Sequence, residues 1–284
     1  LAGVVPLLAR IYPNGKADVN QFDTAGGLGF LIAELLDAGL LHADIRTVWS
    51  DGLDGYRVRA VLGADGKVER VPIERISGDT SVLRSVREPF RTDGGLRVLE
   101  GNLGRAVIKI SAVPDDRQVI ESPALVFDEQ DAVNAAFQRG ELDRDFVAVV
   151  RCQGPRANGM PELHKLTPAL SVLQNRGHRV ALVTDGRMSG ASGTVPAAIH
   201  VTPEAINGGP IGRVRDGDLI RIDALAGTLD VLVDAAELAA REARIDAGRL
   251  AAHRYGLGRE LFARFRELVG PADAGASIFF GDNE

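Results

Sequence analysis

The chain has 284 residues, of which 45% are hydrophobic and 25% charged, enough for one large or two modest globular domains. Its net charge of -6, without any run of Lys or Arg, excludes a nucleic-acid surface and an anionic-membrane patch. The sequence has no stretch of about 18 apolar residues, so no transmembrane helix is predicted. A single cysteine, Cys152, excludes an intrachain disulfide and an iron–sulfur or zinc site built from this chain's thiols alone, and it favours a cytoplasmic protein.

The first predicted element is a helix within residues 17–41. Thr24 is a plausible N-cap, and the string FLIAELLDAGL carries apolar residues at helical spacing until a stop near Gly39. The glycines before it do not form a dinucleotide fingerprint, because Ile32 stands where the third glycine is needed and no strand precedes them. Residues 47–89 are rich in turn formers and predict loops and edge strands, the best position for a connection between domains.

From Gly94 onward the pattern predicts a β-rich domain. Short runs rich in β-branched residues, such as RAVIKISAV, DFVAVVRCQG and HRVALVTDG, are interleaved with helical patterns at DAVNAAFQRGEL and PELHKLTPALSVLQNRG. After Val233, alanine- and arginine-rich segments predict helices on the outside of the domain. We therefore expect a mixed α/β protein with a β-barrel-like domain flanked by helices.

The strongest candidate for chemistry is VALVTDGRMSGASG, residues 180–193, in which an apolar strand runs into a glycine-rich turn. Glycines let several backbone N–H groups point at one spot, an arrangement that stabilises an anion or a developing alkoxide. The turn lacks the lysine of a phosphate-binding P-loop. It also fails as a nucleophile elbow, because Arg187 stands where Ser189 needs a glycine. A glycine turn at a buried strand end without a catalytic role is an equally good interpretation of the local pattern.

A second candidate lies in RCQGPRANGMPELHK, residues 151–165. A strand ends in a loop with two prolines and two glycines, and Glu162 and His164 then open a predicted helix. The Glu162 carboxylate is the kind of hard oxygen ligand that Mg²⁺ prefers. Taken alone, the residue is better explained as a first-turn glutamate that complements the helix dipole.

Together these strings resemble one family. The strings YPNGKADVNQFDTAGGLGFLIAELL, LEGNLGRAVIKISAV, NGMPELHKLTP, VALVTDGRMSGASG and HVTPEA are similar to the C-terminal half of the dihydroxy-acid dehydratase and phosphogluconate dehydratase family, and the resemblance spans nearly the whole chain. It implies an α/β N-terminal domain whose last part is residues 1–88, and a β-barrel-like C-terminal domain at residues 89–284.

The resemblance is stronger to the phosphogluconate members, and it implies a reaction. In that reaction 6-phospho-D-gluconate loses water to give 2-dehydro-3-deoxy-6-phosphogluconate, a step of the Entner–Doudoroff pathway. By motif match Ser189 is the base that removes the C2 proton, Arg187 and Gly190 support it, and Glu162 is a ligand of a divalent ion such as Mg²⁺. A serine hydroxyl is a poor base at neutral pH, so nearby positive charge and N–H donors have to lower its pKa.

The resemblance also implies what this chain does not hold. The cysteines for an iron–sulfur cluster, of the 4Fe–4S type, belong to the N-terminal half, so we expect the chain alone to bind no cluster and to be inactive. The implied partners are the substrate, that N-terminal half and a second copy in a homodimer, with no nucleic acid and no membrane. Two alternatives stay open: a stand-alone domain that binds a sugar phosphate or a partner without catalysis, and another sugar-acid dehydratase of the same family.

Overall fold

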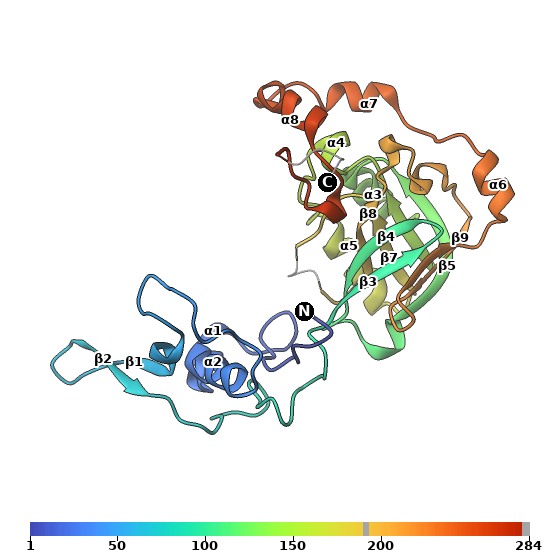
Figure 1. The fold of residues 1–284 in the computed structure, drawn as a ribbon. Helices are drawn as coiled ribbons and strands as arrows, with labels where there is room; N and C mark the ends of the chain where they lie inside the picture. Colours follow the sequence, from blue (N-terminus) through green and yellow to red (C-terminus); the bar gives the residue numbers. More distant parts are fainter. Residues whose placement is uncertain (190–192, 280–284) are drawn as a thin grey trace. The chain divides into compact units, whose positions relative to one another are not determined.

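The computed structural model describes residues 1–189 and 193–279. The chain forms two compact units, Leu1–Leu96 and Arg97–Glu284 (Figure 1). The second unit carries the glycine-rich turn and Glu162, and it is therefore the unit that positions the candidate site.

The first unit has a small core and little regular structure. Its elements are the helices α1 (Val19–Thr24) and α2 (Gly27–Asp37) and the antiparallel strands β1 (Val58–Leu62) and β2 (Val68–Pro72). The helix predicted within residues 17–41 is present, but Thr24 is not its cap. Asp18 and Gln21 form a capping box that starts α1, and Thr24 ends that helix with its hydroxyl bonded to the Asn20 carbonyl oxygen. Gly26, at φ 133°, then separates the two helices.

The second unit is built on a closed barrel of eight strands in the order β10-β3-β4-β8-β7-β6-β5-β9. The strands are β3 (Leu96–Gly101), β4 (Gly104–Lys109), β5 (Val119–Phe127), β6 (Phe146–Val150), β7 (Val180–Thr184), β8 (Ala197–Thr202), β9 (Leu219–Asp223) and β10 (Thr228–Val231). Strands β5, β6, β7 and β8 run parallel to their neighbours in that series, while β9 and β4 pair antiparallel at its two ends.

Strands β6 and β7 are buried on both faces, which explains their uninterrupted apolar sequences. In β6, Val147 and Val149 point into the barrel core, while Phe146, Ala148 and Val150 belong to a second core outside it. That outer core is closed by the helices α3 (Gln130–Gln138) and α5 (Leu166–Asn175). The mixed α/β class and the helix-flanked barrel predicted from the sequence are confirmed.

The segment after the barrel contains only short helices: α6 (Ala235–Ala240), α7 (Ala247–Ala252) and α8 (Ala263–Leu268). A further one-turn helix, α4 (Pro155–Asn158), follows β6. In Figure 1 α7 and α8 lie next to α4, and hydrogen bonds from Arg259 to Asn158 link the two regions. Within the described ranges no helix has the length and apolarity to cross a membrane, for which about 20 residues are needed.

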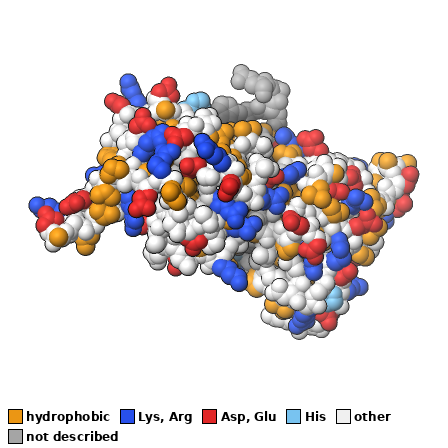
Figure 2. All heavy atoms as spheres, turned by 90° about the horizontal axis from the view of Figure 1, so that it is seen from below, with side chains coloured by type: hydrophobic (Ala, Val, Ile, Leu, Met, Phe, Trp, Pro, Cys, Tyr) orange, Lys and Arg blue, Asp and Glu red, His pale blue; other side chains and the backbone are white. Residues whose placement is uncertain are grey.

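The charges of the surface are mixed. On the face drawn in Figure 2, acidic and basic side chains alternate over short distances without a large field of one sign. This agrees with the sequence, which has 33 Lys and Arg against 39 Asp and Glu.

Candidate functional site

The candidate residues lie on two loops that leave the barrel at the same edge. Strands β6 and β7 are parallel and paired in register from Phe146↔Val180 to Val150↔Thr184. Their carboxyl ends therefore meet, as at the ligand-binding edge of many parallel sheets. The loop after β6 leads to Glu162, and the loop after β7 leads to Arg187 and Ser189.

These three residues contact one another. Glu162 Oε1 accepts a hydrogen bond from the Ser189 backbone N–H at 2.5 Å, and Glu162 Oε2 pairs with Arg187 Nη1 at 2.9 Å. Residues 162 and 187 also form an isolated parallel β-bridge, with Leu163 N–H bonded to the Arg187 carbonyl oxygen at 3.2 Å. Glu162 and Ser189 therefore lie together at the carboxyl ends of two neighbouring strands.

The structure corrects the local interpretation of Glu162. Helix α5 begins at Leu166 with Lys165 as its N-cap, so Glu162 precedes the helix and does not stand in its first turn. Its backbone is instead held beside Arg187 by the β-bridge. The carboxylate consequently faces an arginine and a backbone N–H from the neighbouring loop, and not the amide groups of its own helix.

The site is open to solvent. The side chains of Glu162 and Arg187 are 29% and 49% exposed, and Ser189 is exposed. Arg187 is fixed further by a 2.8 Å hydrogen bond from its Nε to the Met160 carbonyl oxygen. Gly190, predicted to support the base, lies outside the described residues.

Beneath this surface group, a buried carboxylate joins the same loops. Asp185 directly follows β7 and has no exposed surface. Its two oxygens accept hydrogen bonds from the N–H groups of Cys152, Gln153 and Ala205 at 3.1, 2.8 and 3.0 Å. Burial raises the pKa of Asp185, and these hydrogen bonds act in the opposite direction. One side chain thus connects the loops that follow β6, β7 and β8.

Glu204, in the loop after β8, is a second buried carboxylate that accepts backbone N–H groups from a neighbouring loop. It is 5% exposed, and its oxygens accept the N–H groups of Arg156 and Ala157 at 3.0 and 3.1 Å, which fixes the start of α4. Burial raises the pKa of Glu204, and the nearby Asp185 carboxylate adds to the rise. The turn that leads to Glu162 is therefore positioned from below by an acid of the β8 loop.

His200 is one of three non-glycine residues of the region with left-handed backbone, together with Cys152 at φ 59° and Met160 at φ 51°. It lies in β8 at φ 58°, where β8 contains one residue more than β4 between the pairings Arg105↔Thr202 and Val107↔Ile199, a β-bulge. Its N–H bonds to the Gly186 carbonyl oxygen at 2.9 Å, next to Arg187. Burial lowers the pKa of His200, and the Arg187 cation lowers it further, so the neutral imidazole is favoured. Left-handed backbone at a non-glycine residue costs energy and is concentrated at functional sites.

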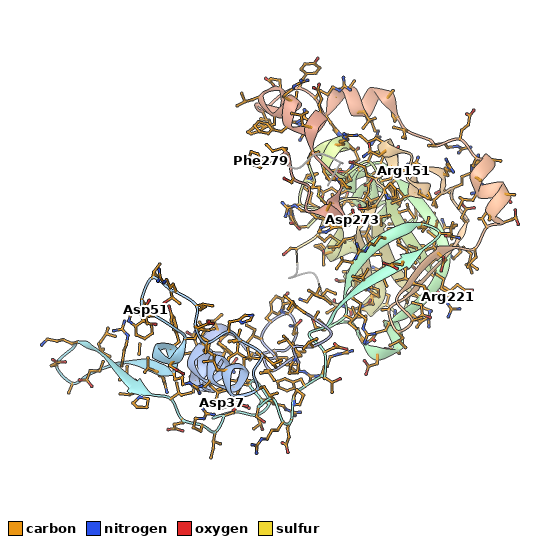
Figure 3. All side chains as sticks on the ribbon, viewed as in Figure 1. Asp37, Asp51, Arg151, Arg221, Asp273 and Phe279 are labelled. Carbon is orange, nitrogen blue, oxygen red and sulfur yellow. The ribbon has the colours of Figure 1, made fainter. Side chains whose placement is uncertain are left out.

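The side chains around Cys152 serve the fold. Arg151 is buried, pairs with Asp128 at 2.8 Å and donates to the Gly212 carbonyl oxygen at 3.2 Å (Figure 3). Burial raises the pKa of the Cys152 thiol to about 12, and the Asp185 carboxylate contributes to that rise. Cys152 is also the chain's one cysteine, and a single thiol supplies at most one of the three or four ligands that a cluster needs.

The described residues likewise do not form a complete metal site. Within 1–189 and 193–279, no three His, Cys, Asp or Glu side chains are grouped so that they could hold an ion. Glu162 uses each oxygen once, and because a carboxylate has about four acceptor positions, each oxygen keeps capacity for a further contact. It could supply a single ligand to an ion held mainly by other residues.

Comparison with known families decides the relationship. Residues 81–276 match the model of the dihydroxy-acid/6-phosphogluconate dehydratase C-terminal domain, and residues 1–56 match the N-terminal model of the same family. The chain belongs to this dehydratase family. Its barrel unit carries the C-terminal match, and the Glu162, Arg187 and Ser189 group lies within that part of the family sequence.

Several curated dehydratases are similar over nearly the whole chain. The phosphogluconate dehydratase of Rhizobium meliloti (strain 1021) is 58% identical over 99% of this chain and 46% of that protein. The phosphogluconate dehydratase of Escherichia coli (strain K12) is 56% identical over 98% of the chain and 45% of that protein. A dihydroxy-acid dehydratase of Solidesulfovibrio magneticus is 37% identical over 95% of the chain. The chain spans about half the length of the curated relatives it matches.

Sequence reasoning missed two residues of this candidate site, His200 and Glu204, and the structural role of a third, Asp185. A signal existed for Asp185, because an acid directly after a fully apolar strand is placed at the buried edge of a sheet. Glu204 and His200 both stand in HVTPEA, which was used as a family marker without a chemical role. Nothing in a single sequence indicates that β8 is bulged at His200.

Proposed function

We propose that the protein containing this chain is a 6-phosphogluconate dehydratase, a hydro-lyase that converts 6-phospho-D-gluconate to 2-dehydro-3-deoxy-6-phosphogluconate and water in the Entner–Doudoroff pathway. The observation that carries this choice is the identity of 58% to a phosphogluconate dehydratase against 37% to a dihydroxy-acid dehydratase over similar lengths of the chain. In this proposal residues 1–88 end the cluster-bearing domain, residues 89–284 form the barrel domain, and the cytoplasmic protein works as a homodimer.

In the proposed mechanism, Ser189 Oγ accepts the C2 proton of the substrate, the C3 hydroxyl departs with its bonding electrons, and the resulting enol tautomerises to the 2-oxo product. The contacts of Ser189 support this role. Arg187, two residues away, brings a positive charge that favours an alkoxide, and Glu162 holds the Ser189 N–H and so fixes the position of the turn. Glu162 contributes one oxygen ligand to a divalent ion such as Mg²⁺.

The iron–sulfur cluster of this proposal has most of its ligands outside the chain, because the chain has one cysteine, the buried Cys152, where a cluster needs three or four thiolates. When bound, such a cluster supplies Lewis acidity toward the departing hydroxyl. The same argument predicts that the 284-residue chain alone does not turn over 6-phosphogluconate.

The test is a substrate comparison on the full-length protein after anaerobic cluster reconstitution. Product formation is followed by NMR with 6-phosphogluconate, gluconate and 2,3-dihydroxy-3-methylbutanoate. The proposal expects 6-phosphogluconate to have the largest kcat/KM. A preference for the branched dihydroxy acid would assign the other family activity. Binding of 6-phosphogluconate without turnover of any of the three would favour a non-catalytic binding protein.

A further inference from the structure

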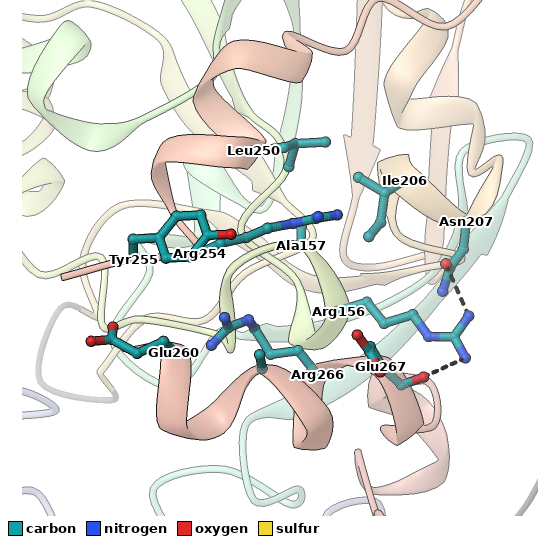
Figure 4. Close-up of a pocket in the computed structure, with 11 residues that line it drawn as sticks. Arg156, Ala157, Ile206, Asn207, Leu250, Arg254, Tyr255, Glu260, Arg266 and Glu267 are labelled. Atoms are coloured by element: carbon teal, nitrogen blue, oxygen red, sulfur yellow. Dashed lines mark hydrogen bonds between the residues drawn. The ribbon is translucent and has the colours of Figure 1, made fainter. Parts of the chain in front are cut away.

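The barrel unit contains a cavity of about 560 Å³ that shares no lining residue with the Glu162, Arg187 and Ser189 group. It lies between α4, the 3-10 turn at Ala205–Asn207, and the segment that runs from α7 to α8 (Figure 4). Three arginines line it, each from a different element: Arg156 from α4, Arg254 from the end of α7 and Arg266 from α8.

Within residues 1–189 and 193–279, none of these guanidinium groups forms an ion pair. Among the described residues, Arg156, Arg254 and Arg266 have no carboxylate oxygen within 4.0 Å. Arg156 reaches only neutral oxygens, the Asn207 side chain and the Glu267 carbonyl, each at 3.4 Å (Figure 4). Arg266 donates to the Arg259 carbonyl at 3.1 Å.

Two buried nitrogen atoms have unused hydrogen-bonding capacity. Arg156 Nε and Arg266 Nη2 are both inaccessible to solvent and make no hydrogen bond within the described part of the chain. Buried donors of charged groups without an acceptor are costly, so their presence on two arginines of one cavity is a specific feature. Because both atoms are closed to solvent, a ligand in the cavity would contact the other N–H groups of these two side chains.

The acidic side chains of the cavity do not cancel this charge. Glu267 lines it, but its carboxylate pairs at 2.7 Å with Arg264, which is not a lining residue. Glu260 also lines it, and its Oε2 accepts the Gly256 N–H at 3.1 Å. Glu267 thus shares its charge with Arg264 and Glu260 keeps its own, so the three arginines still outnumber the unpaired carboxylate of the lining.

The cavity is mechanically connected to the proposed active site. Arg156 stands six residues before Glu162 on the loop after β6, and the buried Glu204 fixes its backbone N–H. The same loop passes Met160, whose carbonyl oxygen holds Arg187. One loop thus presents Arg156 to the cavity and Glu162 to Ser189.

We propose that this cavity binds a phosphate group, and that in the proposed dehydratase, on which this second step rests, the group is the C6 phosphate of the sugar acid. A phosphate monoester offers three acceptor oxygens and a charge near -2, which suits a cage of arginine forks. Asn207 and Tyr255, which also line the cavity, add neutral polar groups at its edge. Free inorganic phosphate shares this chemistry, and the experiment separates the two sources.

The first arm is calorimetric titration of the 284-residue chain with inorganic phosphate, 6-phosphogluconate and gluconate. We expect the two phosphate ligands to bind and gluconate not to bind. Arg254→Ala should weaken binding about 10-fold, since one charge-assisted contact is lost, and Arg254→Ala with Arg266→Ala should weaken it further. Arg264→Ala is the matched control, an arginine of α8 that does not line the cavity, and it should change nothing.

The second arm measures KM for 6-phosphogluconate in the full-length enzyme with the same variants, and thermal unfolding confirms that each is folded. A raised KM with Arg254→Ala assigns the cavity to the substrate phosphate. An unchanged KM with arginine-dependent binding of inorganic phosphate assigns it to free phosphate. Binding that none of the arginine variants alters overturns the site. Absence of dehydration together with arginine-dependent phosphate binding rejects the proposed function and leaves the site standing.

Discussion

Two layers of acidic side chains lie at the same edge of the barrel. The carboxylates of both layers accept backbone N–H groups, but one layer is buried and the other is exposed. Asp185 and Glu204 are buried, and together they accept five backbone N–H groups from the loops around them. Glu162, at 29% side-chain exposure, accepts one backbone N–H and one guanidinium N–H. The buried layer therefore determines where the loops run, and the exposed layer carries groups that a substrate can reach.

This difference predicts that changes in the exposed layer affect turnover and changes in the buried layer affect folding. The largest effect is expected for Ser189→Ala in the full-length dehydratase. Loss of the proposed base should reduce kcat by a factor of about 10²–10⁴ while unfolding is nearly unchanged. Ser171→Ala, on α5, is the control and should retain full turnover. Equal kcat values for the two variants would mean that the base is another residue.

In the buried layer, Asp185→Ala should cost the most stability. It leaves three buried N–H groups without an acceptor, and we expect the free energy of unfolding to fall by about 3–5 kcal/mol. Urea denaturation measures it. Asp145→Ala is a matched change, because Asp145 accepts the Arg179 N–H at the other end of the same strands but is exposed, so water replaces it. Similar losses for both variants would contradict a special role of the buried layer.

The sequence predicted the barrel better than the site, and the reason is physical. All five residues of β6 and four of the five in β7 are apolar, and such a run indicates a strand that is buried on both faces. The location of Ser189 followed from the glycine turn. The pairing of Glu162 with Arg187 could not be predicted from the sequence, because the two residues are 25 positions apart and their contact depends on how two loops leave adjacent strands. Local spacing favoured a helix start at Glu162, and the tertiary β-bridge decided otherwise.

A pH series sharpens the comparison through Glu204. Its pKa is raised in the folded protein above the ordinary value of 4.5, first by burial and then by Asp185. The folded state therefore binds more protons than the unfolded state between those two pKa values, and stability from this group falls as pH rises through that window. Glu204→Gln does not titrate there. We expect the difference in unfolding free energy, wild type minus Glu204→Gln, to decrease from pH 4 towards neutral pH, and a constant difference would reject the raised pKa.

The smallest effect concerns the bulge at His200, where φ is 58°. An L side chain is strained in this region and glycine is not, so His200→Gly should be more stable than His200→Ala by about 1 kcal/mol. Both variants remove the imidazole, and their difference therefore isolates the backbone. At the preceding position Ile199, which is not in the left-handed region, the order should reverse, because glycine weakens an ordinary strand. If alanine were the more stable residue at both positions, the left-handed bulge would not persist in solution. The bulged backbone would then not be what brings the His200 N–H to the Gly186 carbonyl oxygen, next to Arg187.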